Sequence, residues 1–292
     1  MAHLWRCVNA VMLAVMPAEP PATLAYAAHK LGADGENAAQ QRVLPVEMPV
    51  AVSFLGIGYA VMMATPNELE DFAFGFARSE RLIDKAADVT RIEIRAEEKG
   101  VLLGIELVPE RHDRVLARVR HRVGESSCGV CGIENLDQAL RPLPTLPVPA
   151  RIAPAAIFRA LQAIRDHQPL NAETGAVHAA ALCDAQGNVL AAREDVGRHN
   201  AFDKLVGHCL REGVDMGKGF ALLTARCSYE LVEKAALAGI PLLATISAPT
   251  SLAVDRAGEA GLTLIALARS DSVLVMSDPH HLFSHSGEGR DL

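Results

Sequence analysis

The second half of the chain alternates short apolar runs with longer stretches that carry polar residues at helical spacing. Residues 220–224, 241–246 and 262–268 are almost entirely apolar, and each run is long enough for one buried strand. The stretches between them, 228–238 and 250–260, begin with Ser or Thr and are followed by a glycine, which is typical of a capped helix. This alternation with short connections predicts a parallel sheet with helices packed on it.

Parallel sheets bind ligands in the loops outside the carboxyl ends of their strands. Here those loops are 224–228, 247–250 and 269–271, and we expect them to border one pocket. Arg226 and Arg269 follow the first and third runs at equivalent places. The alternative for each arginine is a surface ion pair, but two of them at one sheet edge favour capture of a phosphate group.

The first half of the chain predicts a mixed α+β region. Its apolar patterns predict strands at 43–52, 55–63, 91–95 and 101–108, and helices at 68–80, 133–140 and from Pro154 to about residue 167. Asn67 and Glu70 form the capping-box pattern at the start of the helix at 68–80. A hairpin is expected to begin near His178.

These patterns divide the chain into five segments. We expect a poorly ordered extension at 1–40, an α+β subdomain at 41–140, a proline-rich connector at 141–154, an α/β domain at 155–275 and a tail at 276–292. The α+β subdomain ends in a Cys-x-x-Cys loop.

Composition excludes several classes of protein. With 292 residues and 50% apolar residues, the chain is long and apolar enough to fold around its own core. The 28 Lys and Arg against 35 Asp and Glu give a net charge of −7, which argues against non-specific nucleic-acid binding. No apolar stretch reaches the roughly 18 residues that span a bilayer, and the N-terminus fits a secretory signal poorly, so we expect a cytoplasmic protein without membrane contact.

Six cysteines are present, and only Cys128 and Cys131 form a pattern. Cys183 and Cys209 lie in apolar segments and are expected to be buried small hydrophobes, whereas Cys7 and Cys227 are single. The paired cysteines lie among Ser126, Ser127, Gly129 and Gly132, which indicates a loop.

Three chemistries use such a pair. A zinc site needs further ligands, and no second Cys pair exists. A thioredoxin-like redox pair would lie inside a βαβ unit, but the expected parallel units come much later. A nucleophilic thiolate that carries sulfur as a persulfide would suit a glycine-rich loop. The spacing alone leaves these alternatives open.

The segment from Arg193 to Lys204 is dense in charge and carries the start of a helix. It is either a solvated helix start with routine ion pairs or the rim of a site in which Arg198, His199 and Lys204 offer donors to an anion. Zinc deaminase chemistry is disfavoured, because His178 is followed by Ala179 and Ala180 instead of a nearby Glu.

In order along the chain, five sequence runs resemble the FdhD family of formate dehydrogenase accessory sulfurtransferases. They are Ser127-Cys128-Gly129-Val130-Cys131-Gly132, Glu173-Thr174-Gly175 with His178-Ala179-Ala180, Arg193-Glu194-Asp195-Val196-Gly197-Arg198-His199-Asn200 with Asp203-Lys204, Arg226-Cys227-Ser228-Tyr229-Glu230-Leu231, and Ile246-Ser247-Ala248-Pro249-Thr250-Ser251-Leu252-Ala253 leading to Gly261-Leu262-Thr263-Leu264. Together they span roughly residues 45–272.

The resemblance implies a cytidine-deaminase-like α/β fold, with a parallel or mixed sheet core and a smaller N-terminal α+β subdomain. It implies that Cys128, assisted by Cys131, accepts persulfide sulfur from a cysteine desulfurase and passes it to the bis(molybdopterin guanine dinucleotide) molybdenum cofactor of formate dehydrogenase. That cofactor is a bound substrate, and no permanent metal is expected.

The resemblance also indicates cofactor-binding residues. The family's guanine-dinucleotide segment falls on Leu267, Ala268, Arg269, Ser270, Asp271 and Ser272, although the family usually has an aromatic residue at the first of these positions and a glycine after the arginine. Arg226, His178, Arg198 and His199 complete the expected site. A homodimer is the expected assembly. The alternatives are a non-catalytic chaperone of the molybdenum cofactor and a zinc-binding Cys-x-x-Cys protein.

Overall fold

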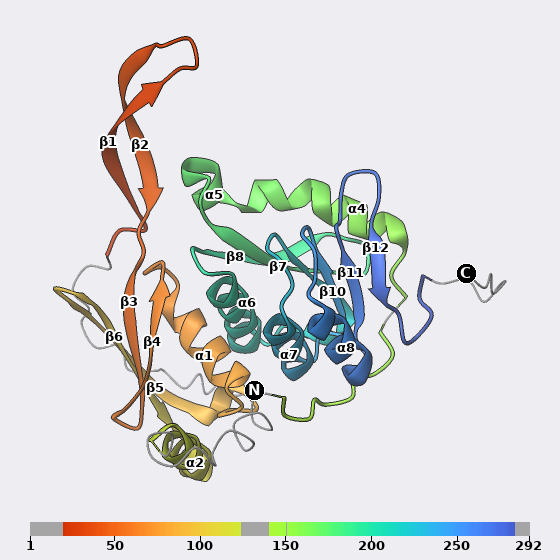
Figure 1. The fold of residues 1–292 in the computed structure, drawn as a ribbon. Helices are drawn as coiled ribbons and strands as arrows, with labels where there is room; N and C mark the ends of the chain where they lie inside the picture. The colour runs from red at the N-terminus through yellow and green to blue at the C-terminus, as the bar shows by residue number, and fades with distance from the viewer. Residues whose placement is uncertain (1–19, 124–139, 150, 284–292) are drawn as a thin grey trace, which may run out of the picture.

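The computed structural model describes residues 20–123, 140–149 and 151–283, and the described residues form three sheets of two, four and six strands (Figure 1). The six-stranded sheet has the order β12-β11-β10-β9-β7-β8. Its strands are β7 (His178–Cys183), β8 (Val189–Asp195), β9 (Phe220–Leu223), β10 (Leu242–Thr245), β11 (Thr263–Ala266) and β12 (Leu274–Ser277).

The parallel centre of this sheet confirms the prediction from the apolar runs. β10 pairs parallel with both β9 and β11, whereas the hairpin of β7 and β8 and the edge strand β12 pair antiparallel. The core sheet is therefore mixed, and the expected α/β class with a smaller N-terminal α+β part is confirmed.

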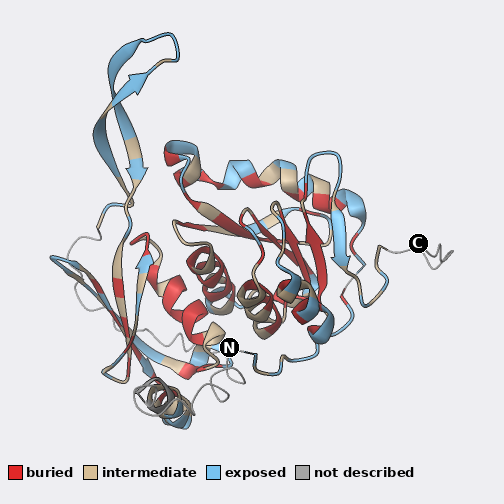
Figure 2. Ribbon diagram, viewed as in Figure 1, coloured by how far each residue is buried: buried red, intermediate tan, exposed pale blue. Residues whose placement is uncertain are grey.

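Helices cover both faces of the sheet (Figure 1). One face carries α6 (Arg198–Glu212), α7 (Tyr229–Ala238) and α8 (Ser251–Ala260), and the other carries α4 (Pro154–Ala163). All residues of β9, β10 and β11 are buried, as Figure 2 shows, because apolar side chains of both helix layers pack against them. That two-sided burial explains why these strands are continuous apolar runs.

The N-terminal part is a four-stranded sheet of order β4-β3-β6-β5. Its elements are β3 (Met48–Phe54), β4 (Ile57–Ala64), α1 (Leu69–Ser79), β5 (Val89–Glu97), β6 (Gly100–Leu107) and α2 (His112–Val123). The remaining helical segments are α5 (Pro169–Thr174) and the 3-10 turns Ala86–Asp88, Pro109–Arg111, Ile164–His167 and Met216–Lys218. Phe54, Phe72 and Phe76 pack between this sheet and α1.

A long hairpin of β1 (Thr23–Leu31) and β2 (Asn37–Pro45) projects from the body (Figure 1). The expected poorly ordered extension at 1–40 is therefore wrong for the residues of these strands, and residues 1–19 lie outside the described residues. The hairpin is exposed on both faces, so its side chains lack the core-facing alternation by which strands are recognised.

Several predicted boundaries are also wrong. The strand expected at 43–52 is split, because β2 ends at Pro45 and β3 begins at Met48. The helix expected from Pro154 to about residue 167 ends at Ala163 and continues as a 3-10 turn.

The tail expected at 276–292 begins inside β12, which pairs with β11. The helix expected at 133–140 falls almost wholly outside the described residues, with only Leu140 described, in a turn.

The cap of α1 differs from the capping box that the sequence predicts. Glu68 occupies the N-cap with φ 52° and makes no side-chain cap hydrogen bond. Asn67 instead accepts a hydrogen bond from Lys204 Nζ at 3.0 Å. The side chain of Asn67 therefore binds Lys204, which is distant in the sequence, instead of capping α1.

Two glycines let α1 and α6 cross in direct backbone contact. A Cβ at Gly75 would lie 1.7 Å from the carbonyl oxygen of Asp203, and a Cβ at Gly207 would lie 1.8 Å from that of Asp71. No side chain fits at either position without separating the helices. This crossing joins the N-terminal part to the α/β part.

The substitution Gly207→Ala should therefore lower the free energy of unfolding by on the order of 3 kcal/mol, because the added methyl group meets backbone. Urea unfolding of the two proteins measures the change. The matched control is Gly258→Ala in α8, where a Cβ meets nothing within 4 Å, and which should raise stability by roughly 0.5–1 kcal/mol. Equal effects of the two substitutions would contradict the close crossing.

Candidate functional site

The segment from Arg193 to Lys204 is largely buried and holds the two parts of the molecule together. Lys204 and Asp195 form an ion pair of 2.7 Å, and both side chains have no exposed surface. Lys204 Nζ also donates to the backbone oxygen of Thr65 at 3.0 Å, just after β4. Lys204 is thus fully used inside the protein, and its predicted role as a donor to a bound anion is wrong.

Asp195 is satisfied by several donors besides Lys204. Its carboxylate accepts hydrogen bonds from the backbone N–H of Thr65 at 3.1 Å and of Gly197 at 2.8 Å. It also accepts from Asn200 Nδ2 at 3.1 Å, and the same amide nitrogen donates to the backbone oxygen of Met63 at 2.8 Å. The end of β4 is therefore fixed to the junction of β8 and α6.

The charged side chains of Arg193 and Glu194 also form contacts within the protein. Glu194 accepts hydrogen bonds from the backbone N–H of Leu170 and Asn171, both at 2.8 Å, and so caps α5. Arg193 forms an ion pair with Asp71 on α1 at 2.8 Å. These contacts are buried or part-buried, so the interpretation of the segment as a solvated helix start is wrong.

Asp203 connects α6 to both α1 and α7. Its buried carboxylate accepts hydrogen bonds from Ser79 Oγ at 2.6 Å and from Lys234 Nζ, which lies 2.7 Å from both oxygens. Burial raises the pKa of Asp203, and the Lys234 charge opposes that rise. Asp203 therefore serves the packing of three helices and is not available to a ligand.

Arg198 and His199 lie in the first turn of α6 and are partly exposed. Arg198 is the first residue of α6, and its Nε is buried with no hydrogen-bond partner among the described residues. His178 begins β7, and its pKa is lowered by burial and by the positive charges of Arg198 and Arg226. His178, Arg198 and Arg226 therefore lie near one another at the edge of the sheet where β9 ends, close enough for the two positive charges to act on the imidazole.

His199 faces a different neighbour. Its Nε2 lies 3.3 Å from the carboxylate of Glu230 on α7. Burial and the charges of Lys234 and Arg198 lower the pKa of His199 to about 4, against the opposing effect of Glu230. The imidazole is thus neutral near pH 7 and lines a 370 Å³ cavity between α7 and the N-terminal sheet.

Backbone contacts hold the three strand-end loops side by side, as expected from the parallel sheet. Cys227 and Pro249 form an isolated parallel bridge, with hydrogen bonds of 3.2 Å to Ala248 and 3.0 Å from Thr250. The backbone N–H of Leu267 donates to Ser247 in the loop after β10, at 3.2 Å, and that of Ala268 donates to Thr245 at the end of β10, at 3.1 Å.

The expected guanine-dinucleotide segment, 267–272, is anchored at this edge. Leu267 has φ 49°, and Ala268 is buried. Arg269 is exposed, but its Nη1 donates to the carbonyl oxygen of Ile246, so one of its nitrogens is already bound within the protein. Ser270, Asp271 and Ser272 are exposed. The segment thus presents mostly polar, accessible residues next to the other loops.

The cysteines fall into two groups. Cys183, Cys209 and Cys227 are buried, and burial raises the pKa of each thiol to about 12, so these thiols are unreactive and the prediction that Cys183 and Cys209 are core residues is confirmed. Cys7, Cys128 and Cys131 lie outside the described residues. Among the described residues, no cluster of three or more His, Cys, Asp or Glu is arranged to hold a metal ion.

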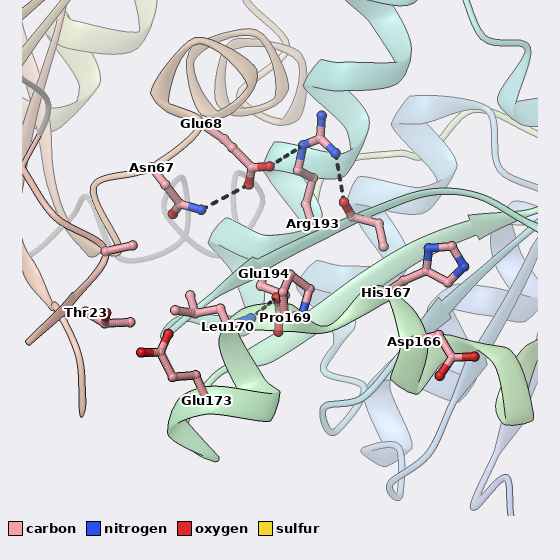
Figure 3. Close-up of a pocket in the computed structure, with 12 residues that line it drawn as sticks. Thr23, Asn67, Glu68, Asp166, His167, Pro169, Leu170, Glu173, Arg193 and Glu194 are labelled. Carbon is pink, nitrogen blue, oxygen red and sulfur yellow. Dashed lines mark hydrogen bonds and ion pairs between the residues drawn. The ribbon is translucent and has the colours of Figure 1, made fainter. Parts of the chain in front are cut away.

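Sequence reasoning missed a 630 Å³ cavity at the base of the hairpin (Figure 3). It is lined by the carboxylates of Glu68, Asp166, Glu173 and Glu194, together with Asn67 and Arg193. Figure 3 shows Glu68 pointing toward Arg193, at 3.1 Å, and accepting from Asn67 Nδ2 at 3.4 Å. Burial raises the pKa of Glu68. No local sequence pattern links these residues, because they come from four separate elements.

Comparison with known proteins decides the family. The model of the FdhD/NarQ family matches residues 45–283. The chain belongs to the FdhD/NarQ family. The resemblance expected from the sequence is thereby confirmed.

Curated relatives of this FdhD/NarQ chain carry the name "Sulfur carrier protein FdhD". The protein of Xanthomonas euvesicatoria pv. vesicatoria is 50% identical over 85% of this chain and 88% of its own length. That of Burkholderia mallei is 44% identical over 86% of this chain and 94% of its own length. A crystal structure of a formate dehydrogenase accessory protein from Desulfotalea psychrophila has a TM-score of 0.70 at 23% identity, covers 89% of this chain and 98% of that chain, and shows the shared fold.

No helix in the described part of this FdhD/NarQ chain is long and apolar enough to cross a membrane.

The substitution Lys204→Met should lower the free energy of unfolding by about 3–5 kcal/mol, because Asp195 would then be a buried charge without its cation. Denaturant unfolding checks this. Lys218→Met is the matched control, since Lys218 is 82% exposed and should change stability by less than about 0.5 kcal/mol. A loss at Lys204 no larger than that of the control would contradict the role of the ion pair.

Proposed function

We propose that this protein is a sulfur carrier that serves formate dehydrogenase. In this proposal Cys128 accepts persulfide sulfur from a cysteine desulfurase, Cys131 assists, and the sulfur passes to the bis(molybdopterin guanine dinucleotide) cofactor. The observation that carries the proposal is family membership over residues 45–283, shared with relatives named sulfur carriers, together with the Cys128 and Cys131 pair. A cytoplasmic location and a homodimer stay predictions.

The acceptance step is a thiol–persulfide exchange. The Cys128 thiolate attacks the terminal sulfur of the donor persulfide, forming one S–S bond, while the S–S bond of the donor breaks. The donor leaves as a thiolate, and Cys128 becomes the persulfide. The exchange needs no external oxidant or reductant. Since the buried thiols of Cys183, Cys209 and Cys227 have pKa values raised to about 12, they do not compete as nucleophiles.

The group of His178, Arg198 and Arg226 supports binding of a phosphorylated substrate. Buried polar atoms in proteins almost always have hydrogen-bond partners, so the orphaned Nε of Arg198 fits a donor whose acceptor is supplied by a ligand. Arg198 also begins α6, where the helix dipole favours negative charge. Neutral His178 can accept or donate a hydrogen bond beside the two guanidinium groups. These residues would hold the phosphates of the cofactor, with segment 267–272 alongside.

The second candidate function is a non-catalytic chaperone of the molybdenum cofactor. The same group of His178, Arg198 and Arg226 favours it, because anion binding there does not require the cysteines. The two functions differ in whether Cys128 carries sulfur, which the first measurement below tests. The second measurement tests the anion site that both functions would use.

The first measurement is mass spectrometry after incubation with a cysteine desulfurase and cysteine. Cys128 should gain about 32 Da, the mass of one sulfur atom. The Cys128→Ala protein should show no such adduct in that segment and should lose most activation of formate dehydrogenase. The control is Cys209→Ala, in which a buried thiol is removed and the adduct on Cys128 persists. Full activation by Cys128→Ala would overturn the sulfur carrier and leave the chaperone.

The second measurement is the affinity for guanosine diphosphate, which stands for the nucleotide half of the cofactor. The substitutions Arg198→Gln and Arg226→Gln should each weaken binding by roughly tenfold, because each removes a charge-assisted hydrogen bond to phosphate. Arg165→Gln, at an exposed position of the 3-10 turn after α4, is the control and should leave affinity unchanged. Affinities unaltered by the first two substitutions would contradict a phosphate site at this edge.

A further inference from the structure

A separate cavity of 310 Å³ lies between the end of α1, α2 and the start of the proline-rich connector. It is lined by four arginines, one carboxylate and two apolar side chains: Arg81, Arg114, Arg118, Arg141, Glu80, Leu82 and Ala117. It shares Glu80, Arg118 and Arg141 with the 370 Å³ cavity beside His199. In a chain of net charge −7, this local excess of positive charge is unusual.

Two of the four arginines have carboxylate partners. Arg114 donates to both oxygens of Asp84, at 2.9 Å each, and Arg118 lies 3.3 Å from Glu80. The second pair neutralises Glu80, the only carboxylate that lines the cavity among the described residues.

Arg81 and Arg141 have no such partner. Within the described part of the chain, no carboxylate lies within ion-pair distance of either guanidinium group. The guanidinium group of Arg81 donates to the backbone oxygen of Pro142, at 3.0 Å. Burial and the neighbouring positive charges, including that of Arg141 on Arg81, lower the pKa of both residues. Glu233 opposes this lowering of the pKa at both residues, and Glu80 opposes it at Arg141, but neither carboxylate forms an ion pair with them. The two guanidinium groups are therefore half-buried and close together, with no carboxylate of the described residues in direct contact.

The backbone turn after α1 determines where Arg81 lies. Arg81 has φ 63°, a left-handed conformation that costs a residue with a side chain on the order of 1 kcal/mol. The turn that contains Arg81 directly follows α1 and places its side chain beside the connector that begins at Arg141. The left-handed residue also closes α1, since the backbone N–H groups of Arg81 and Leu82 donate to the carbonyl oxygens of Arg78 and Ala77. The turn that ends the helix thus sets where the Arg81 side chain lies.

The position of the cavity along the chain connects it to the cysteines. Helix α2, which carries Arg118, ends at Val123, and the described chain resumes at Leu140, next to Arg141. Residues 124–139, which include Cys128 and Cys131, are the segment between these two points. The arginine cavity is therefore lined by residues of the two described stretches that flank this segment in the sequence, α2 and the connector.

We propose that Arg81 and Arg141 bind a carboxylate side chain of the sulfur-donating protein and so dock that protein beside the cysteine segment. This inference rests on the proposed function, because thiol–persulfide exchange requires the donor persulfide to reach Cys128. Planar guanidinium groups bind carboxylates with two parallel hydrogen bonds, which fixes orientation as well as position. The cofactor phosphates have their own donors in Arg198 and Arg226, so the cavity is left for a second anion.

The test compares two sulfur donors on the double variant Arg81→Gln/Arg141→Gln. With a cysteine desulfurase and cysteine, the rate of persulfide formation on Cys128 should fall by roughly tenfold, and the wild-type rate should fall with rising salt toward that of the variant. With a neutral low-molecular-weight persulfide, the variant and wild-type rates should be equal. Arg165→Gln is the control and should match wild type with both donors. Thermal unfolding of each protein checks that the fold is retained.

Each other outcome has a defined meaning. Wild-type rates for the double variant with the desulfurase overturn the proposal. A loss of guanosine diphosphate affinity in the double variant, with no change in desulfurase rate, assigns the cavity to a phosphate and also overturns it. If wild-type protein takes sulfur from neither donor, the proposed function fails. The docking proposal is then tested by measuring the dissociation constant of the complex with the desulfurase for the wild-type protein and for the double variant. A constant unchanged by the double substitution then refutes docking, and one raised roughly tenfold supports it.

Discussion

The structure depends on the buried ion pair of Lys204 and Asp195. Burying two opposite charges is tolerable only when they meet each other and when every remaining donor and acceptor is satisfied. Here Lys204 Nζ also reaches Thr65 and Asn67, and Asp195 accepts from backbone N–H groups on both sides of the interface. Because these partners belong to the chain after β4 and to the junction of β8 and α6, the charges are satisfied only when the two parts of the molecule are joined.

That constraint also positions the candidate site. Once Asp195 and Lys204 are fixed, the first turn of α6 has one orientation, and the glycine crossing with α1 sets its distance from the N-terminal part. Arg198 and His199 lie on that turn, between the two buried charges in sequence. One short segment therefore holds the two parts together and carries Arg198, a residue of the candidate site.

The sequence predicts the centre of the fold better than its edges. β9, β10 and β11 are continuous apolar runs because helices cover both of their faces, and this signal is local. The hairpin of β1 and β2 has no buried face and hence no such pattern. The site behaves in the same way: the strand-end position of Arg226 follows from chain order, whereas the capture of Lys204 by Asp195 and the clustering of Arg81 with Arg141 depend on contacts between segments far apart in the sequence.

Whether a charged group already has a hydrogen-bond or ion-pair partner distinguishes a candidate site from a structural contact better than its residue type does. The cavity of Figure 3 is rich in carboxylates, yet Glu194 is bound by the amides of α5 and Glu68 by Arg193, so two of its charges are already satisfied. Arg198 has an orphaned buried nitrogen, and Arg81 and Arg141 are half-buried with no carboxylate of the described residues within ion-pair distance. A fold that elsewhere pairs its buried charges with distant partners leaves these arginines without an ion pair among the described residues. They lie at two places, one beside segment 267–272 and one beside the stretches that flank the cysteine segment in the sequence. The proposed transfer of sulfur from a donor protein to an anionic cofactor would use two such places.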